Sequence, residues 1–108
     1  PYAAGQSFTQ HLMLQLNTYR LEESEKEIAK FLVGSVDESG YIRREIADIV
    51  DDLAFTQNVY TQEAAVESVL EKVQELDPAG VGARDLQACI LLQLKRKKAS
   101  IEKRLRTR

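Results

Sequence analysis

Few residues in this chain have side chains that catalyse reactions or bind metal ions. The sequence contains one histidine, His11, and one cysteine, Cys89. A structural zinc site needs four nitrogen or sulfur ligands, so one residue of each kind cannot assemble it. Cys89 also stands among apolar neighbours, where a thiol behaves as a small inert hydrophobic group. The residue types therefore predict a protein that is not an enzyme and uses no metal or cofactor.

The carboxylates do not complete a chemical site either. Asp37 and Ser39 begin like a calcium loop, but the sixth position of such a loop needs glycine and here holds Ile42. Asp51 and Asp52 are neighbours in sequence, and adjacent residues of a helix do not face each other. We instead expect Asp37 and Gly40 to end a helix and turn the chain. Tyr41 should bury its ring there and keep its hydroxyl in water.

A glycine-rich loop is the most specific motif of the chain. Residues 76–94 read LDPAGVGARDLQACILLQL, and the loop residues of this motif are Asp77, Pro78, Gly80, Val81 and Gly82. Asp77 can accept from the amides that follow it, Pro78 suits a first helical position, and the glycines permit conformations that other residues avoid. A dinucleotide-binding loop would need a third glycine and a preceding strand, which the sequence lacks. We expect a loop with one fixed shape.

Apolar residues recur with helical spacing along almost the whole chain. The stripes predict helices within residues 8–19, 21–36, 42–53, 61–76 and 84–98. Thr61 is the expected cap of the fourth helix. Tyr41 and Ile42 can make at most a bridge, because no segment alternates apolar and polar residues long enough for a strand. The predicted fold class is all-α: a small bundle of about four helices, the glycine-rich loop and a further apolar helix, without significant sheet.

The chain is expected to divide at the loop. Residues 1–76 form an N-terminal helical bundle, residues 77–98 supply the loop and helix of a second, truncated subdomain, and residues 99–108 form a basic tail. The fifth helix is apolar on nearly every side and needs cover. A lone amphipathic helix is marginal in water, so we expect it to pack on the first bundle. The alternative is a weak partner supplied through Ile101 and Leu105.

Two glutamines occupy equivalent places in apolar runs. Gln15 and Gln93 each precede a leucine and point toward the buried stripe of their helix. A buried amide without partners costs on the order of 1 to 3 kcal/mol. We therefore predict that each bonds to loop backbone or to another buried polar group, with residues 77–82 nearest to Gln93. The alternative is a half-exposed amide at the edge of the bundle.

Charge is divided unevenly along the chain. Residues 95–108 hold eight basic residues and one acidic residue, a net charge of plus seven, and residues 1–94 hold seven basic and sixteen acidic, a net charge of minus nine. A basic tail can contact nucleic acid or an acidic protein surface, but a solvated linker is the interpretation we favour. The chain has no apolar run of ~20 residues that would cross a membrane. A single cysteine suits the reducing cytoplasm.

Residues 76–94 resemble the sigma-54 family of bacterial transcription initiation factors, in the region that binds core RNA polymerase. The family pattern LDPxGVGARDLxECLLLQL differs at Ala88, where the family has Glu, and at Ile90. Residues 36–42 are similar to the family's LDxxGYL, and residues 11–16 to its HLxxQL. The resemblance covers most of residues 8–94. The family's activator-responsive leader and promoter-reading modules are missing, so the chain resembles an excised fragment.

The resemblance implies a module that docks the factor on core RNA polymerase and forms the activator-dependent holoenzyme. Promoter DNA would be contacted only through modules absent from this chain, and the ATP-dependent activator would act on it indirectly. The fragment would be a cytoplasmic monomer without cofactor or membrane contact. The candidate partner-binding residues are Arg84, Asp85, Gln87, Leu91 and Lys95. Two alternatives stay open: Arg84 and Asp85 can instead secure a helix start, and Leu91 can instead pack against missing downstream helices.

A DNA-binding module is the alternative function. The second and third helices have the spacing of a loose helix-turn-helix, with Arg43 and Arg44 at the start of the recognition helix. The body of that helix is acidic, however. Its carboxylates would meet DNA phosphates, whose neutralisation by Lys and Arg supplies nearly all nonspecific affinity.

Overall fold

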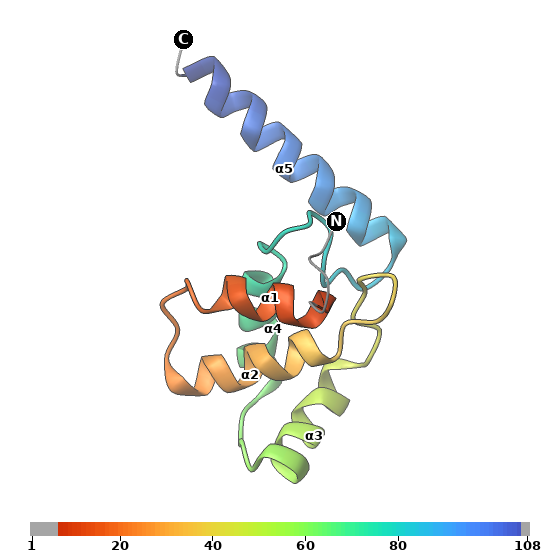
Figure 1. Cartoon of the computed structure of the whole chain (residues 1–108). Helices are drawn as coiled ribbons and strands as arrows, with labels where there is room; N and C mark the ends of the chain where they lie inside the picture. The colour runs from red at the N-terminus through yellow and green to blue at the C-terminus, as the bar shows by residue number, and fades with distance from the viewer. Residues whose placement is uncertain (1–6, 107–108) are drawn as a thin grey trace.

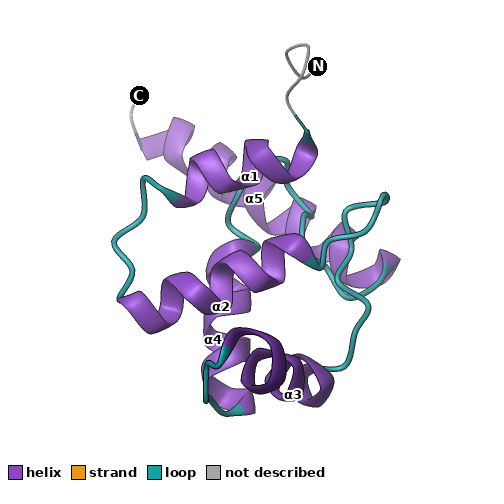
Figure 2. Cartoon of the chain, turned by 60° about the horizontal axis from the view of Figure 1, so that its bottom comes forward, coloured by secondary structure: helices purple, strands orange, loops and turns teal. Residues whose placement is uncertain are grey.

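The computed structural model describes residues 7–106, which form five helices joined by loops (Figure 1). Helix α1 covers Phe8–Leu16, α2 covers Glu23–Gly34, α3 covers Ile46–Gln57, α4 covers Glu63–Val73 and α5 covers Leu86–Arg106. Over this part of the chain, Figure 2 shows only helices and loops. The predicted all-α fold is confirmed.

The hydrophobic core lies among α1, α2, α3 and α4. Helix α2 packs against both α1 and α4, and α4 also packs against α3. Leu12, Leu32, Ile49, Leu53 and Val66 are completely buried there. Removing such a side chain from water stabilises the fold by roughly 1.5 to 3 kcal/mol. The apolar stripes of the first four predicted helices are therefore the core of the protein.

The start of α4 differs from the prediction. Gln62 occupies the capping position and the helix begins at Glu63, so Thr61 lies one residue too early to cap it. Gln62 makes no capping hydrogen bond through its side chain. Glu63 in the first turn is favourable there, because a carboxylate stabilises the positive end of a helix dipole.

Ile42 was expected inside the third helix but lies before it in an extended segment. Its amide donates to the carbonyl of Ala83 at 3.0 Å, and Tyr41 forms an isolated parallel bridge with Ala83. Ile42 is fully buried, so its apolar character is explained by the core rather than by helix α3. The isolated bridge at Tyr41 agrees with the expectation that Tyr41 and Ile42 make at most a bridge.

Helix α5 departs from the prediction in length. It was expected to end at Lys98, but it continues to Arg106 through most of the predicted basic tail; Arg108 lies outside the described residues. Residues 99–106 contain no glycine or proline, and most of them are good helix formers. Basic side chains in the last turn also stabilise the negative end of the helix dipole. The tail is therefore a continuation of the helix.

The predicted packing of α5 on the bundle is wrong for the described residues. None of those in α5 is buried, and the helix extends away from α1–α4 (Figure 1). The described chain is correspondingly elongated, with principal dimensions of 51, 35 and 28 Å. Among residues 7–106, no helix is both long and apolar enough to cross a membrane.

Candidate partner-binding surface

The two sequence motifs, at residues 36–42 and 76–94, meet in space at the base of α5. The amide of Gly82 donates to the carbonyl of Gly40 at 2.8 Å, next to the bond between Ile42 and Ala83. Gly40 and Gly82 have φ angles of 89° and 79°, a backbone region that glycine adopts far more readily than other residues. The segments 36–42 and 76–94 therefore hold each other in place through backbone hydrogen bonds. Val81 and Ala83 of the loop are buried beside the core of the bundle.

Asp37 organises the first of these turns. Its Oδ1 accepts from the amides of Ser39 at 2.8 Å and Tyr41 at 3.0 Å, and its Oδ2 lies 2.9 Å from Arg43 Nε. The hydrogen bond from Tyr41 and the nearby Arg43 guanidinium hold the pKa of Asp37 below its usual value. The turn was predicted, but α2 has already ended at Gly34, so Asp37 and Gly40 do not end the helix.

The half-buried ring of Tyr41 supports this turn from the side. The guanidinium carbon of Arg43 lies 4.7 Å from the centre of the ring. Contact of this kind between a cation and an aromatic face is attractive. Arg43 is thus occupied by Tyr41 and Asp37 within its own turn.

Asp77 connects α1 to α5. The side-chain Nε2 of Gln15 donates to the Asp77 carbonyl at 2.7 Å, and the backbone amide of Asp77 donates to Gln15 Oε1 at 2.8 Å. The prediction that Gln15 bonds to loop backbone is confirmed. The Asp77 carboxylate, expected to accept from the amides that follow it, instead accepts from Arg96 at 2.6 Å. Arg96 satisfies this carboxylate because α5 passes beside the loop.

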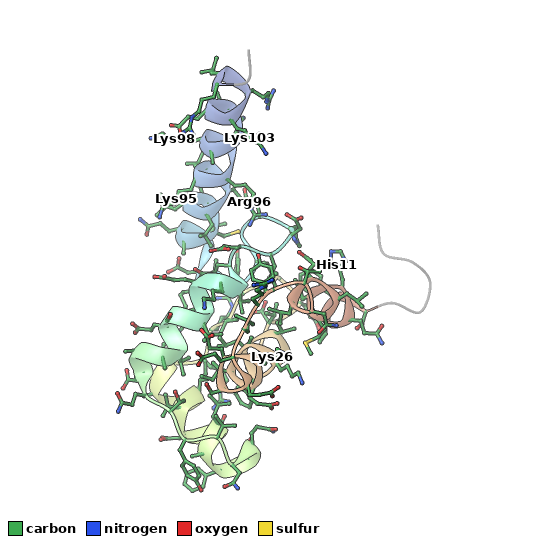
Figure 3. The ribbon with its side chains drawn as sticks, turned by 90° about the vertical axis from the view of Figure 1, so that its left-hand side faces the viewer. His11, Lys26, Lys95, Arg96, Lys98 and Lys103 are labelled. Atoms are coloured by element: carbon green, nitrogen blue, oxygen red, sulfur yellow. The ribbon has the colours of Figure 1, made fainter. Side chains whose placement is uncertain are left out.

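Arg96 joins α5 to the end of α4 as well. Its Nη2 donates to the carbonyls of Leu76 at 3.1 Å and Gln74 at 3.3 Å. These carbonyls follow the last turn of α4, where positive charge is favourable. Figure 3 shows Arg96 on the side of α5 nearer the loop and Lys95 on the other side. Burial, and then the Glu75 carboxylate, raise the pKa of Tyr19 at the edge of this junction.

The backbone of the loop passes close to α5 at Gly80. Its φ is 96°, and a Cβ atom there would lie 2.6 Å from Cys89 Sγ and 3.2 Å from Gln93 Nε2. Gln93 donates to Cys89 Sγ at 3.5 Å, and its side chain is exposed. The prediction of a bond from Gln93 to the loop backbone is therefore wrong, because α5 does not bury that face. Glycine is required here for close approach.

Pro78 makes a turn rather than a helix start. The Asp77–Pro78 peptide bond is cis, and the Pro78 carbonyl accepts from the amide of Val81 at 3.1 Å. The next helix begins only at Leu86. The prediction of a first helical position at Pro78 is therefore wrong.

Arg84 and Asp85 hold the start of α5. The Arg84 guanidinium donates to the carbonyls of Ile42, at 2.7 Å, and Arg44. Asp85 Oδ1 accepts from the amide of Ala88 at 2.9 Å, and its carbonyl accepts from Cys89 at 3.0 Å, which is the geometry of a helix cap. Both residues thus have structural partners in the described chain.

The other three candidate residues, Gln87, Leu91 and Lys95, are exposed on α5. They belong to a helix with an unusual concentration of exposed apolar side chains. Those on α5 are Leu86, Ile90, Leu91, Leu94, Ile101 and Leu105. Large apolar residues gathered on one exposed element mark an interaction site more often than scattered ones do. Across residues 7–106, no cluster of three or more His, Cys, Asp or Glu is placed to hold a metal ion.

A helical body that carries an exposed, apolar and basic helix is typical of protein-interaction modules. The sequence matches the family model described as the sigma-54 factor core binding domain over residues 2–107. The chain therefore belongs to the sigma-54 factor family, as the motif at residues 76–94 predicted. This is a family of transcription initiation factors and not of enzymes.

Individual relatives support the assignment. The chain is 43% identical to the RNA polymerase sigma-54 factor of Acidithiobacillus ferridurans over 83% of its length. It is 46% identical to that of Bacillus subtilis (strain 168) over 70% of its length, and 35% identical to that of Escherichia coli (strain K12) over 82%. The matched segments make up 18%, 16% and 18% of these relatives respectively.

Proposed function

We propose that this chain binds core RNA polymerase and docks a sigma-54 type factor on it. The observation that carries the proposal is the match to the core binding domain over nearly the whole chain. The exposed apolar side chains of α5 support it, because they offer a contact area that the described chain does not cover. In this role the chain uses no cofactor and acts as a monomer in the cytoplasm.

The docked factor, we further propose, forms a holoenzyme that depends on an activator. Promoter DNA is contacted through parts of the factor outside this chain, and the ATP-consuming activator acts on the assembled complex. Within the chain, Gln87, Leu91 and Lys95 contact the polymerase from the exposed side of α5. Arg84 and Asp85 contribute by fixing where α5 begins.

The geometry of α2 and α3 does not favour the DNA-binding alternative. A helix-turn-helix joins its helices by three or four residues, whereas α2 and α3 are joined by residues 35–45. Arg43 and Arg44 lie before α3 and pair with Asp37 and Asp52, respectively. These arginines are therefore engaged within the chain rather than presented on a recognition helix.

A direct comparison of the two partners tests the proposal. The fluorescently labelled chain is titrated with purified core polymerase, and anisotropy is followed. In parallel, promoter DNA is titrated with the same chain at the same salt concentration in a mobility-shift assay. We expect saturable binding to polymerase and no retardation of DNA. Retarded DNA together with unchanged anisotropy on adding polymerase would overturn the proposal.

A further inference from the structure

Two glutamines of the bundle hold the two ends of the glycine-rich loop. Gln15 of α1 bonds to both backbone groups of Asp77, accepting from its amide at 2.8 Å and donating to its carbonyl at 2.7 Å. Gln74, the residue that follows the last turn of α4, donates from Nε2 to the carbonyl of Gly82 at 3.0 Å. The amide of Gly82 donates in turn to the carbonyl of Gly40. At both ends of the loop, the backbone amide and the backbone carbonyl are therefore engaged by residues outside it.

Helix α5 is tied to the same segment. The guanidinium of Arg96 donates to Asp77 Oδ1 at 2.6 Å and to the backbone carbonyl of Gln74 at 3.3 Å, and Figure 3 shows Arg96 on the loop side of the helix. The start of α5 also lies close to Gly80, where an added Cβ would be 2.6 Å from Cys89 Sγ. All of these contacts lie at the base of α5 and not on its outer face. A displaced loop would therefore carry the base of α5 with it.

These glutamines contribute more to the position of the loop than to the stability of the bundle. The core among α1–α4 is apolar, whereas Gln15 and Gln74 are half-buried at its edge. Asp77 is exposed, so its backbone groups can bond to water when the Gln15 amide is removed, and the loss of stability is small. The carbonyl of Gly82 belongs to a buried residue and regains a partner most easily if the loop shifts toward water. Loss of the amides should thus free the loop and α5 while the bundle stays folded.

We propose that Gln15 and Gln74 are positioning residues, which fix the direction of α5 relative to the bundle and thereby raise the affinity for core RNA polymerase. This role rests on the proposed function and adds the residues that orient its binding helix. The core binding domain matches residues 2–107, so the bundle and α5 belong to one matched unit. A polymerase surface that contacts both parts binds only molecules in which α5 has the right direction. The apparent affinity then falls in proportion to the fraction of such molecules.

Variants of similar size test the positioning directly. Gln15→Met and Gln74→Met keep the length of each side chain and most of its packing but remove its amide. Spin labels at Ser68 on α4 and Ser100 on α5, carried by unnatural amino acids so that Cys89 stays intact, report the direction of α5. In the double variant the distance distribution should broaden until about a third of the molecules or fewer keep the parent distance, a shift within the range of a few lost hydrogen bonds. An unchanged narrow distribution would overturn the proposal.

Two controls separate the direction of α5 from the folding of the bundle. Labels at Ser24 on α2 and Ser68 on α4 measure a distance within the bundle, which should keep its parent distribution in the double variant. Gln57→Met removes an exposed amide of α3 that bonds to the neighbouring Thr56, and it should change neither this distance nor the distance to α5. Broadening of the distance between Ser24 and Ser68 in the double variant would show that the glutamines stabilise the bundle itself, against the proposal.

Binding to core polymerase connects the direction of α5 to function. The double variant of Gln15 and Gln74 should bind about three- to tenfold more weakly than the parent. This factor should equal the loss in the fraction of molecules that keep the parent distance. Saturating polymerase should restore the parent distance between Ser68 and Ser100, because binding selects molecules with that direction. Parent-like affinity despite a broadened distribution would refute the role in binding.

The outcomes also separate this proposal from the proposed function. If the parent chain does not bind polymerase, the proposed function fails together with the link to affinity, and the distances still decide whether the glutamines hold α5. If the parent binds and the double variant keeps both the narrow distribution and the parent affinity, the positioning role is refuted and the docking role stands. Circular dichroism checks that each variant keeps its helices.

Discussion

The bundle of α1–α4 and helix α5 use apolar residues in opposite ways. In the bundle, Leu12, Leu32 and Leu53 are completely buried against neighbouring helices. On α5, Leu91 and Leu94 stand more than half exposed. The difference shows that apolar content alone does not identify a core. The apolar residues of the bundle hold the fold together, whereas those of α5 are available to another surface.

The two regions also differ in charge and in how they are joined. Acidic residues dominate the bundle, and basic residues dominate α5 from Lys95 onward. The junction includes polar contacts made by Arg96, the hydrogen bonds from Arg84 to the carbonyls of Ile42 and Arg44, and the close approach at Gly80. A helix held by polar contacts at its base keeps a defined direction while its apolar side stays free.

The largest expected effect contrasts one leucine from each region. Leu53→Ala should lower the free energy of unfolding by about 2 to 5 kcal/mol, because it leaves a cavity in the core. Leu94→Ala should change it by only about 0.5 kcal/mol or less, since the side chain is exposed. Urea unfolding followed by circular dichroism measures both. Similar losses of unfolding free energy for the two variants would mean that Leu94 is packed in solution. The proposed difference between a buried bundle and an exposed α5 would then be wrong.

The second prediction concerns the contact between the regions at Gly80. Gly80→Ala should destabilise the protein by roughly 3 kcal/mol, combining an unfavourable positive φ with overpacking against Cys89. The matched control is Gly34→Ala, where nothing lies within 4 Å of the added Cβ. Alanine suits a helix better than glycine, so the control should stabilise by up to about 0.5 kcal/mol. The same unfolding experiment gives both values, and a neutral Gly80→Ala would contradict the close approach.

The third prediction tests whether Arg96 fixes the direction of α5. Arg96→Ala removes an ion pair with Asp77 and two hydrogen bonds to carbonyls, and should cost about 1 kcal/mol because the site is partly exposed. Spin labels at Ser100 and at Ser68 on α4 report the direction of the helix, and their distance distribution should broaden. Lys97→Ala, on the same helix, is the control. An equally narrow distribution in both variants would show that other contacts fix the helix.

Local patterns explain which parts of the fold could be predicted from sequence. The buried stripes of α1–α4 repeat every three or four residues, so their periodicity reveals them without knowledge of any neighbour. The hydrogen bonds of Gln15 could also be predicted, because an amide in an apolar stripe needs a polar partner. The length of α5 was missed although its signal was present. Residues 99–106 lack a helix breaker and most of them favour helix, although their charge is also typical of a solvated linker.

The junction could not be predicted because it depends on contacts between distant segments. The sequence alone does not identify Arg96, among several basic neighbours, as the partner of Asp77, because only the direction of α5 brings the two residues together. Likewise, both Gly40 and Gly82 signal turns, but their hydrogen bond exists only because two loops meet. The exposure of α5 was missed for the same reason, since an apolar helix has the same pattern whether its partner belongs to the chain or lies outside it.

The smallest expected effect is the pH dependence that the Asp37 turn contributes to the bundle. The pKa of Asp37 is lowered from its usual 3.8, chiefly by the hydrogen bond from the Tyr41 amide. A carboxyl with a lowered pKa adds stability above pH 3.8, and this contribution is lost as the pH falls through the pKa of the folded state. Asp37→Asn should therefore be less stable than the parent near pH 6, with a gap that narrows in acid. Glu38→Gln, which removes an equal charge from the neighbouring exposed residue, is the control in urea unfolding from pH 2 to 6. A constant gap between Asp37→Asn and the parent across that range would show that the carboxylate charge is not what stabilises the turn.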